Sequence, residues 1–199
     1  MSKLFKVKDH FYKKAKKENF LARSIYKLEE IDQQYKILKP GNLVLDLGYY
    51  PGSWIQYTSA KVVDGQVVGI DIQEVNPKLA SLPNVKLMQK DIDTVRGISD
   101  LGVGRKFDVV LSDMAPSTTG VKMVDQARSL NLVEMVFGLL LPLLERNGNM
   151  VAKVFDSHDA QVFLKTQKKR FKDFNYLKPK STRSISKEFF VIGKGFLGE

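Results

Sequence analysis

Two segments constrain what this chain can fold into, because each joins a short apolar run to an acid and a turn. The first is Leu-Asp-Leu-Gly-Tyr-Tyr-Pro-Gly (Leu45 to Gly52), and the second is Leu-Ser-Asp-Met-Ala-Pro (Leu111 to Pro116). In an open sheet of parallel strands, ligands bind beyond the carboxyl ends of the strands. The two segments therefore predict an α/β fold in which one strand end holds a nucleotide-like cofactor and a later one holds the chemistry.

Short β-rich runs alternate with helical patterns along the rest of the chain. This alternation favours a mostly parallel sheet with helices on both faces. Strands are predicted at 43–47, 67–70, 85–88, 107–111, 150–155 and 189–192. Helices are predicted at 19–35, with Asn19 as the N-cap, and at 53–61, 126–146 and 158–171. With 199 residues the chain fits one compact domain, expected at 19–199, preceded by a mobile basic arm at 1–18.

The chain is strongly basic, with 32 Lys and Arg residues against 22 Asp and Glu residues and a net charge of +10. Such a surplus suits a polyanionic partner, because each neutralised phosphate releases counterions. A basic run can also be a solvated helix face. Two runs on one basic domain nevertheless favour RNA or DNA. The runs are Lys13, Lys14, Lys16 and Lys17, and then Lys165, Lys168, Lys169, Arg170 and Lys172.

Several classes of protein are disfavoured by what the sequence lacks. It has no cysteine, and its only histidines are His10 and His158, so we expect neither disulfides nor a protein-bound metal. The longest apolar stretch, Val136 to Leu144, is too short to span a bilayer. We expect a cytoplasmic monomer without membrane contact, and an organellar location stays open.

Acids mark the carboxyl ends of the predicted strands. Gly48 and Gly52 would let the backbone approach a ligand closely, and Asp71 stands where an acid commonly accepts ribose hydroxyls. The same residue types also occur as plain turn and capping residues, and the spacing is not that of the dinucleotide fingerprint. The strand-end acids are Asp46, Asp71, Asp91 and Asp113.

Four segments, taken in order, resemble a known family. They are Ala22 to Leu28, Asp46 to Trp54, Ser112 to Pro116 together with Val151 to Phe155, and Ser186 to Glu188. The chain resembles the FtsJ/RrmJ family of S-adenosylmethionine-dependent RNA 2′-O-ribose methyltransferases over most of its length. The resemblance implies a Rossmann-like methyltransferase fold and S-adenosyl-L-methionine as cofactor. It implies a catalytic set of Lys27, Asp113, Lys153 and Glu188, and cofactor contacts from Gly52, Trp54, Asp71, Asp91 and Asp113, beside the strand-end residues Asp46 and Gly48.

The chain departs from the family pattern near the cofactor. Tyr49 and Tyr50 stand where the family usually places small residues, so they could narrow the pocket or turn outward. Ser53 replaces a usual glycine, and Lys187 stands where arginine is common.

The expected chemistry needs a base, because a ribose hydroxyl must become a nucleophile. A lysine serves as a base only if its pKa falls from about 10.4 toward about 7 to 8, through desolvation or a neighbouring cation. Lys153 on its apolar strand suits this role and Lys27 could supply the cation, whereas the charges of Asp113 and Glu188 oppose it. We therefore assign the two acids to orienting the lysine and the hydroxyl.

Structural alternatives exist for each of these residues. Lys153 and Glu188 could form an ordinary ion pair across strands, Lys27 could be a snorkelling lysine on an amphipathic helix, and Trp54 could be core. The segment Lys178 to Glu188 resembles that of the bacterial-type ribosomal members of the family, which implies a uridine in large-subunit rRNA as substrate, with tRNA as the alternative. An RNA-binding assembly factor without turnover is a different class, and a small-molecule methyltransferase would leave the basic surplus unexplained.

Overall fold

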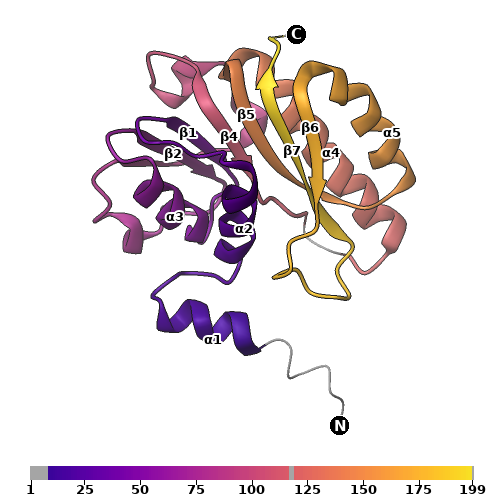
Figure 1. The fold of residues 1–199 in the computed structure, drawn as a ribbon, viewed down its shortest axis with the longest axis horizontal. Coiled ribbons are helices and arrows are strands. Elements are labelled where there is room, and N and C mark those ends of the chain that lie inside the picture. Colours follow the sequence, from indigo (N-terminus) through magenta and orange to yellow (C-terminus); the bar gives the residue numbers. More distant parts are fainter. Residues whose placement is uncertain (1–8, 117–118, 199) are drawn as a thin grey trace.

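A seven-stranded sheet in the order β3-β2-β1-β4-β5-β7-β6 forms the centre of the protein (Figure 1). The computed structural model describes residues 9–116 and 119–198. Strands β1 to β5 run parallel, and β7 pairs antiparallel with both β5 and β6. The strands are β1 (Leu43–Leu47), β2 (Gln66–Asp71), β3 (Val85–Gln89), β4 (Phe107–Ser112), β5 (Leu144–Phe155), β6 (Phe171–Leu177) and β7 (Glu188–Phe196).

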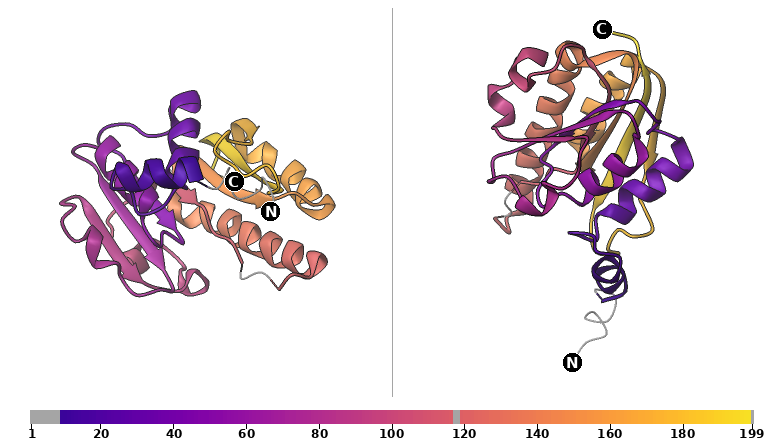
Figure 2. Two further views of the ribbon diagram at one scale, coloured as in Figure 1. Left: turned by 90° about the horizontal axis from the view of Figure 1, so that it is seen from below. Right: turned by 90° about the vertical axis from the view of Figure 1, so that its left-hand side faces the viewer.

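Helices cover both faces of the sheet (Figure 2). The helices α2 and α3 pack on one face, and α4 and α5 pack on the other. The α-helices are α1 (Asp9–Lys17), α2 (Ile25–Tyr35), α3 (Ser53–Lys61), α4 (Lys122–Leu143) and α5 (His158–Gln167). Short 3-10 turns are η2 (Pro77–Leu79), η3 (Ile92–Thr94), η4 (Ile98–Leu101) and η5 (Lys168–Arg170).

The central strands are buried on both faces, which explains their continuous apolar runs. In β1, Leu45 belongs to the core under α4 and α5, whereas Val44 belongs to the core under α2 and α3. The strand order reverses between β1 and β4, where Leu47 lies beside Ser112. This reversal opens the crevice in which such sheets bind ligands. The predicted α/β class with a mostly parallel sheet is thus confirmed.

Several predicted element boundaries were wrong. The helix expected from Asn19 begins at Ile25, because Asn19 adopts a left-handed conformation with φ 60° and Ser24 is the N-cap. The helix expected at 126–146 spans Lys122–Leu143. The helix expected to reach residue 171 ends at Gln167, and strand β6 follows. Phe171 and Phe174 are buried and lie three residues apart, which is the spacing of a helix, so the pattern did not predict this edge strand.

The expected basic arm is described only in part, because residues 1–8 lie outside the described residues. Residues 9–17 form helix α1, where Ala15 is buried in the core beneath α2 and α3. The hydroxyl of Tyr26 on α2 donates a hydrogen bond to Glu18 at 2.8 Å. The mobility of the arm stays a prediction.

No helix within the described ranges is long and apolar enough to cross a membrane, and the same residues contain no group of three or more His, Cys, Asp or Glu that could hold a metal ion.

The missing side chain of Gly69 in β2 makes room for Tyr49, which follows β1. Tyr49 is only 3% exposed. A Cβ atom at Gly69 would lie 2.9 Å from Cδ1 of Tyr49, 2.9 Å from Cδ1 of Ile55 and 2.8 Å from Cδ2 of Leu87. Real Cβ atoms do not approach neighbours so closely, so Tyr49 turns into the core only because residue 69 is glycine.

We predict that Gly69→Ala destabilises the protein by about 1 to 3 kcal/mol, because three buried side chains must shift. The matched control is Gly138→Ala, since Gly138 lies exposed within α4 and a Cβ there would meet nothing within 4 Å. The control should stabilise the protein by about 0.5 to 1 kcal/mol. Urea unfolding of both variants measures the difference, and equal stability of the two would contradict this account of Tyr49.

Candidate active site at the carboxyl ends of the strands

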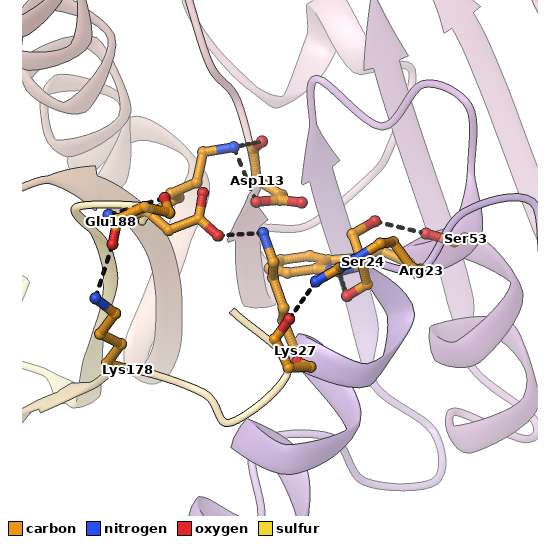
Figure 3. Close-up of polar contacts among 11 residues, drawn as sticks. Arg23, Ser24, Lys27, Ser53, Asp113, Lys178 and Glu188 are labelled. Atoms are coloured by element: carbon orange, nitrogen blue, oxygen red, sulfur yellow. Dashed lines mark hydrogen bonds and ion pairs between the residues drawn. The ribbon is translucent and has the colours of Figure 1, made fainter. Parts of the chain in front are cut away.

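Two lysine–acid pairs meet at the carboxyl ends of the parallel strands (Figure 3). Lys27 Nζ of α2 lies 2.5 Å from Glu188 Oε1 at the start of β7. Lys153 Nζ of β5 lies 3.0 Å from Asp113 Oδ1, just after β4, and donates a hydrogen bond to the main-chain oxygen of Asp113 at 2.5 Å. All four side chains are largely buried, that of Lys153 being 8% exposed. The four residues of the expected catalytic set therefore lie together.

These ion pairs differ from the structural alternative, in which Lys153 and Glu188 would form an ordinary ion pair across strands. Each lysine instead has its own carboxylate, and Glu188 reaches from the sheet to α2. Burial would raise the pKa of Glu188, but the charges of Lys27 and Lys153, with hydrogen bonds from Lys27 and Ser186, hold that pKa below its usual value. Glu188 is therefore ionised at neutral pH and can balance two cations.

The start of α3 holds the start of α2, which carries Lys27. The indole nitrogen of Trp54 donates to the main-chain oxygen of Ser24 at 2.9 Å, and the hydroxyls of Ser24 and Ser53 lie 2.9 Å apart (Figure 3). The amide of Lys27 donates to the same Ser24 oxygen at 3.0 Å. Ser53, one of the departures from the family pattern, thus adds a contact that fixes Lys27. Trp54 itself is buried, with its ring 5.8 Å from that of Phe190.

The loop between β6 and β7 lies over α2 and leads into Glu188. Arg23 Nη2 donates to the main-chain oxygen of Ser181 at 2.5 Å, and the amide of Lys180 donates to Glu30 at 2.8 Å. Lys178 Nζ donates to the main-chain oxygen of Ser186 at 2.7 Å (Figure 3). These contacts fix the segment that presents the catalytic glutamate expected from the sequence.

Between α2 and this loop lies a basic cavity of about 380 Å³. Its polar lining includes Lys27 and Glu188 from the cluster together with Arg23 and Arg183. Burial lowers the pKa of Arg23, the charge of Arg183 lowers it further, and Glu188 opposes both. Three further residues of the site, Arg23, Ser24 and Arg183, were not predicted from the sequence. All three lie in or beside the segments that carry the family resemblance, which was the available signal.

A larger cavity of about 580 Å³ has Asp113 among its lining residues. Asp71 and Asp91, both expected at a cofactor site, are among its lining residues, and Ile72, Ile92, Leu132 and Met135 supply apolar walls. Asp71 accepts hydrogen bonds from the amides of Tyr50 at 3.0 Å and Gln73 at 2.9 Å, which fixes its carboxylate. An apolar cavity with a few fixed acids suits a nucleoside, whose base needs apolar contact and whose ribose donates hydrogen bonds.

A small cavity of about 30 Å³ lies beside the larger one and is lined by Asp46, Tyr49, Ser53 and Trp54, among others. Asp46 is 1% exposed, and its Oδ2 has no hydrogen-bond partner in the described part of the chain. Burial raises the pKa of Asp46 well above its usual value, and the charges of Asp113 and Asp71 raise it further.

Three of the expected cofactor residues, Asp46, Gly52 and Trp54, do not line the large cavity. Trp54 lines only the small cavity. Gly52 lines neither, because Leu79 packs against it; a Cβ there would be 2.3 Å from Leu79 Cδ1. Its φ of 112° lets the chain turn from β1 into α3. Gly48 and Asp113 line both the large and the small cavity.

Comparisons with known proteins agree with this arrangement. The profile of the family described as FtsJ-like methyltransferase matches residues 20–196. A protein of Bdellovibrio bacteriovorus named ribosomal RNA large subunit methyltransferase E is 44% identical over 190 residues, which is 95% of this chain and 97% of that protein. One of Syntrophobacter fumaroxidans with the same name is 44% identical over 191 residues, 95% and 96% of the two chains. The crystal structure of a ribosomal RNA methyltransferase from Plasmodium falciparum superposes with a TM-score of 0.77 at 28% identity, covering 90% of this chain and 100% of that one.

The ion pair of Lys27 with Glu188 predicts a pH-dependent loss of stability. Glu188→Gln should destabilise the protein at pH 7 by about 1 to 3 kcal/mol, because Lys27 loses its charged partner in a largely buried place. The folded-state pKa of Glu188 is lowered, so this contribution is complete above the unfolded value of about 4.3 and is lost as pH falls through the folded value.

Thermal unfolding of wild type and Glu188→Gln at pH 7 and below pH 4 checks this prediction. The difference between the two should shrink in acid. Glu134→Gln, a change on the exposed face of α4, serves as the control and should have no effect at either pH. A Glu188→Gln effect that does not vary with pH would contradict the role given to its charge.

Proposed function

This chain belongs to the FtsJ-like methyltransferase family, and we propose that it transfers a methyl group from S-adenosylmethionine to the 2′-oxygen of a ribose in large-subunit ribosomal RNA. The observation that carries the proposal is the meeting of two lysine–acid pairs between an acid-rimmed cavity and a basic one. The names of the relatives support ribosomal RNA as the substrate, and so does the net charge of +10.

The larger cavity would hold the methyl donor. Asp71 and Asp91 would accept hydrogen bonds from the ribose and base of its nucleoside, and the isoleucine and methionine side chains would cover the base. When bound, S-adenosylmethionine supplies an electrophilic methyl carbon on a sulfonium. Gly48 lies where the two cavities join, and Met114 packs against it: a Cβ there would lie 2.2 Å from Met114 Cγ.

The basic cavity would hold the target nucleotide. Arg23 and Arg183 would neutralise phosphates of the RNA backbone, and Lys27 would place the ribose hydroxyl. Because Glu188 balances the charge of Lys27, that ammonium can donate a hydrogen bond to the 2′-oxygen without leaving an unpaired buried charge. The target hydroxyl would thus lie between the two lysines.

Lys153 would accept the proton of the hydroxyl. The 2′-oxygen loses its proton to Lys153 Nζ as it takes the methyl group, so the amine must be neutral before the step and becomes an ammonium after it. The main-chain oxygen and carboxylate of Asp113 fix the position of Nζ and balance the new charge. This assigns Asp113 and Glu188 to orientation rather than to proton transfer.

We predict that Lys153→Arg lowers the methyl-transfer rate by about 10² to 10⁴-fold, because guanidinium keeps the charge but gives up no proton. Binding of S-adenosylmethionine should be little changed, since Lys153 lines none of the three cavities described. Single-turnover assays measure the rate, with Lys168→Arg on the exposed turn η5 as the control. Near-normal turnover in Lys153→Arg would rule out the base.

The substrate is tested by transfer of labelled methyl to unmodified large ribosomal subunits, naked ribosomal RNA and tRNA. We expect label in the large-subunit RNA at a ribose 2′-oxygen, located by resistance of the adjacent bond to alkaline hydrolysis. Label in tRNA alone would replace the proposed substrate. Binding of RNA and donor without label in any of the three would instead favour an assembly factor that keeps the fold without turnover.

A further inference from the structure

The large and the small cavity share three lining residues, Gly48, Tyr50 and Asp113, and we call this place the junction. The large cavity extends from the junction toward Asp71 and Asp91, whereas Asp113 contacts Lys153. A ligand whose nucleoside lies at the two strand-end acids and whose reactive group faces Lys153 must therefore pass the junction.

The junction has a deficit of positive charge. Asp46 lies beside it, almost completely buried, and its Oδ2 atom has no hydrogen-bond partner among the described residues. A buried carboxylate oxygen without a partner is costly, so such an atom calls for explanation by a group that is absent. Asp71 and Asp113 add like charge close by, and Lys153 offsets only that of Asp113. A group that carries positive charge would satisfy this oxygen and would stabilise the ionised form of Asp46, which burial and the neighbouring acids disfavour.

Tyr50 adds an aromatic ring at the same place. Its side chain is 50% exposed, although it lines both cavities, and its amide is held by Asp71 Oδ2 at 3.0 Å. Its neighbour Tyr49 has turned into the core against Gly69, so the two tyrosines have separate roles. The face of an aromatic ring attracts cations, by about 0.5 to 1 kcal/mol at exposed sites.

We propose that Asp46 and Tyr50 make the junction selective for positive charge, so that the protein binds a sulfonium ligand more tightly than the neutral thioether of the same shape. The inference rests on the proposed function, because methyl transfer turns the sulfonium of S-adenosylmethionine into the thioether of S-adenosylhomocysteine. Selectivity of this kind favours release of the product after each turnover. The selectivity depends on this chain's own residues, because Tyr50 stands where the family resemblance leads one to expect a small side chain.

Titration calorimetry with S-adenosylmethionine and S-adenosylhomocysteine tests the proposal without any turnover. Wild type should bind the sulfonium more tightly, and Tyr50→Leu should reduce the ratio of the two dissociation constants by about 2- to 5-fold. Tyr50→Phe keeps the ring and should keep the ratio. Tyr12→Leu is the matched control, because Tyr12 is 60% exposed on α1 and lines none of the three cavities.

Asp46→Asn tests the carboxylate, since it keeps the shape and removes the charge. This variant should reduce the same ratio, with thermal unfolding as the check that it folds; should it not fold, Tyr50→Leu decides alone. Equal loss of affinity for both ligands in Tyr50→Leu, or equal binding of both by wild type, would overturn the proposal. Binding of neither ligand by wild type would overturn the proposed function itself, and with it this inference.

Discussion

The parallel pairing of β1 with β4 is the constraint on which the site depends. Because Leu47 lies beside Ser112, the turn that begins at Gly48 and the acid Asp113 leave the sheet at the same edge. The next pairing, of Ser112 with Ala152, brings Lys153 to that edge as well. A slip of one residue in either register would point these side chains to the opposite face. The site is therefore specified by the same strand register that builds the core.

The ion pair of Lys27 with Glu188 joins parts of the chain that the sheet alone would not hold together. Lys27 on α2 and Glu188 on β7 are linked directly, and the loop before Glu188 is tied to α2 through Arg23 and Glu30. Buried ion pairs contribute little net stability, since desolvation offsets their attraction. Their concentration at one edge of the sheet is thus better explained by function than by folding, as perturbed carboxyl groups in a cleft often are.

The sequence predicted the strand ends well because that information is local: an apolar run followed by an acid. It failed in β6, because Phe171 and Phe174 are buried three residues apart, which is the spacing of a helix and not the alternation of a strand. The partners in the two ion pairs could not be predicted from the sequence either. In the β5–β7 ladder Lys153 lies opposite Phe190 and Glu188 lies opposite Phe155, so the two charges are diagonal neighbours. Glu188 forms its ion pair with Lys27 only because α2 lies close to this end of β7. Likewise, the packing of Leu79 against Gly52 depends on tertiary contacts.

The central claim is that Lys27 and Glu188 act as one unit in methyl transfer. A double-mutant cycle tests it, with Lys27→Ala, Glu188→Ala and the double variant compared in the rate of labelled methyl transfer to large-subunit RNA under single-turnover conditions. Groups that act together are strongly non-additive. The account predicts that the double variant is about as slow as the slower single variant. Losses that multiply would show that Lys27 and Glu188 contribute independently and would contradict it.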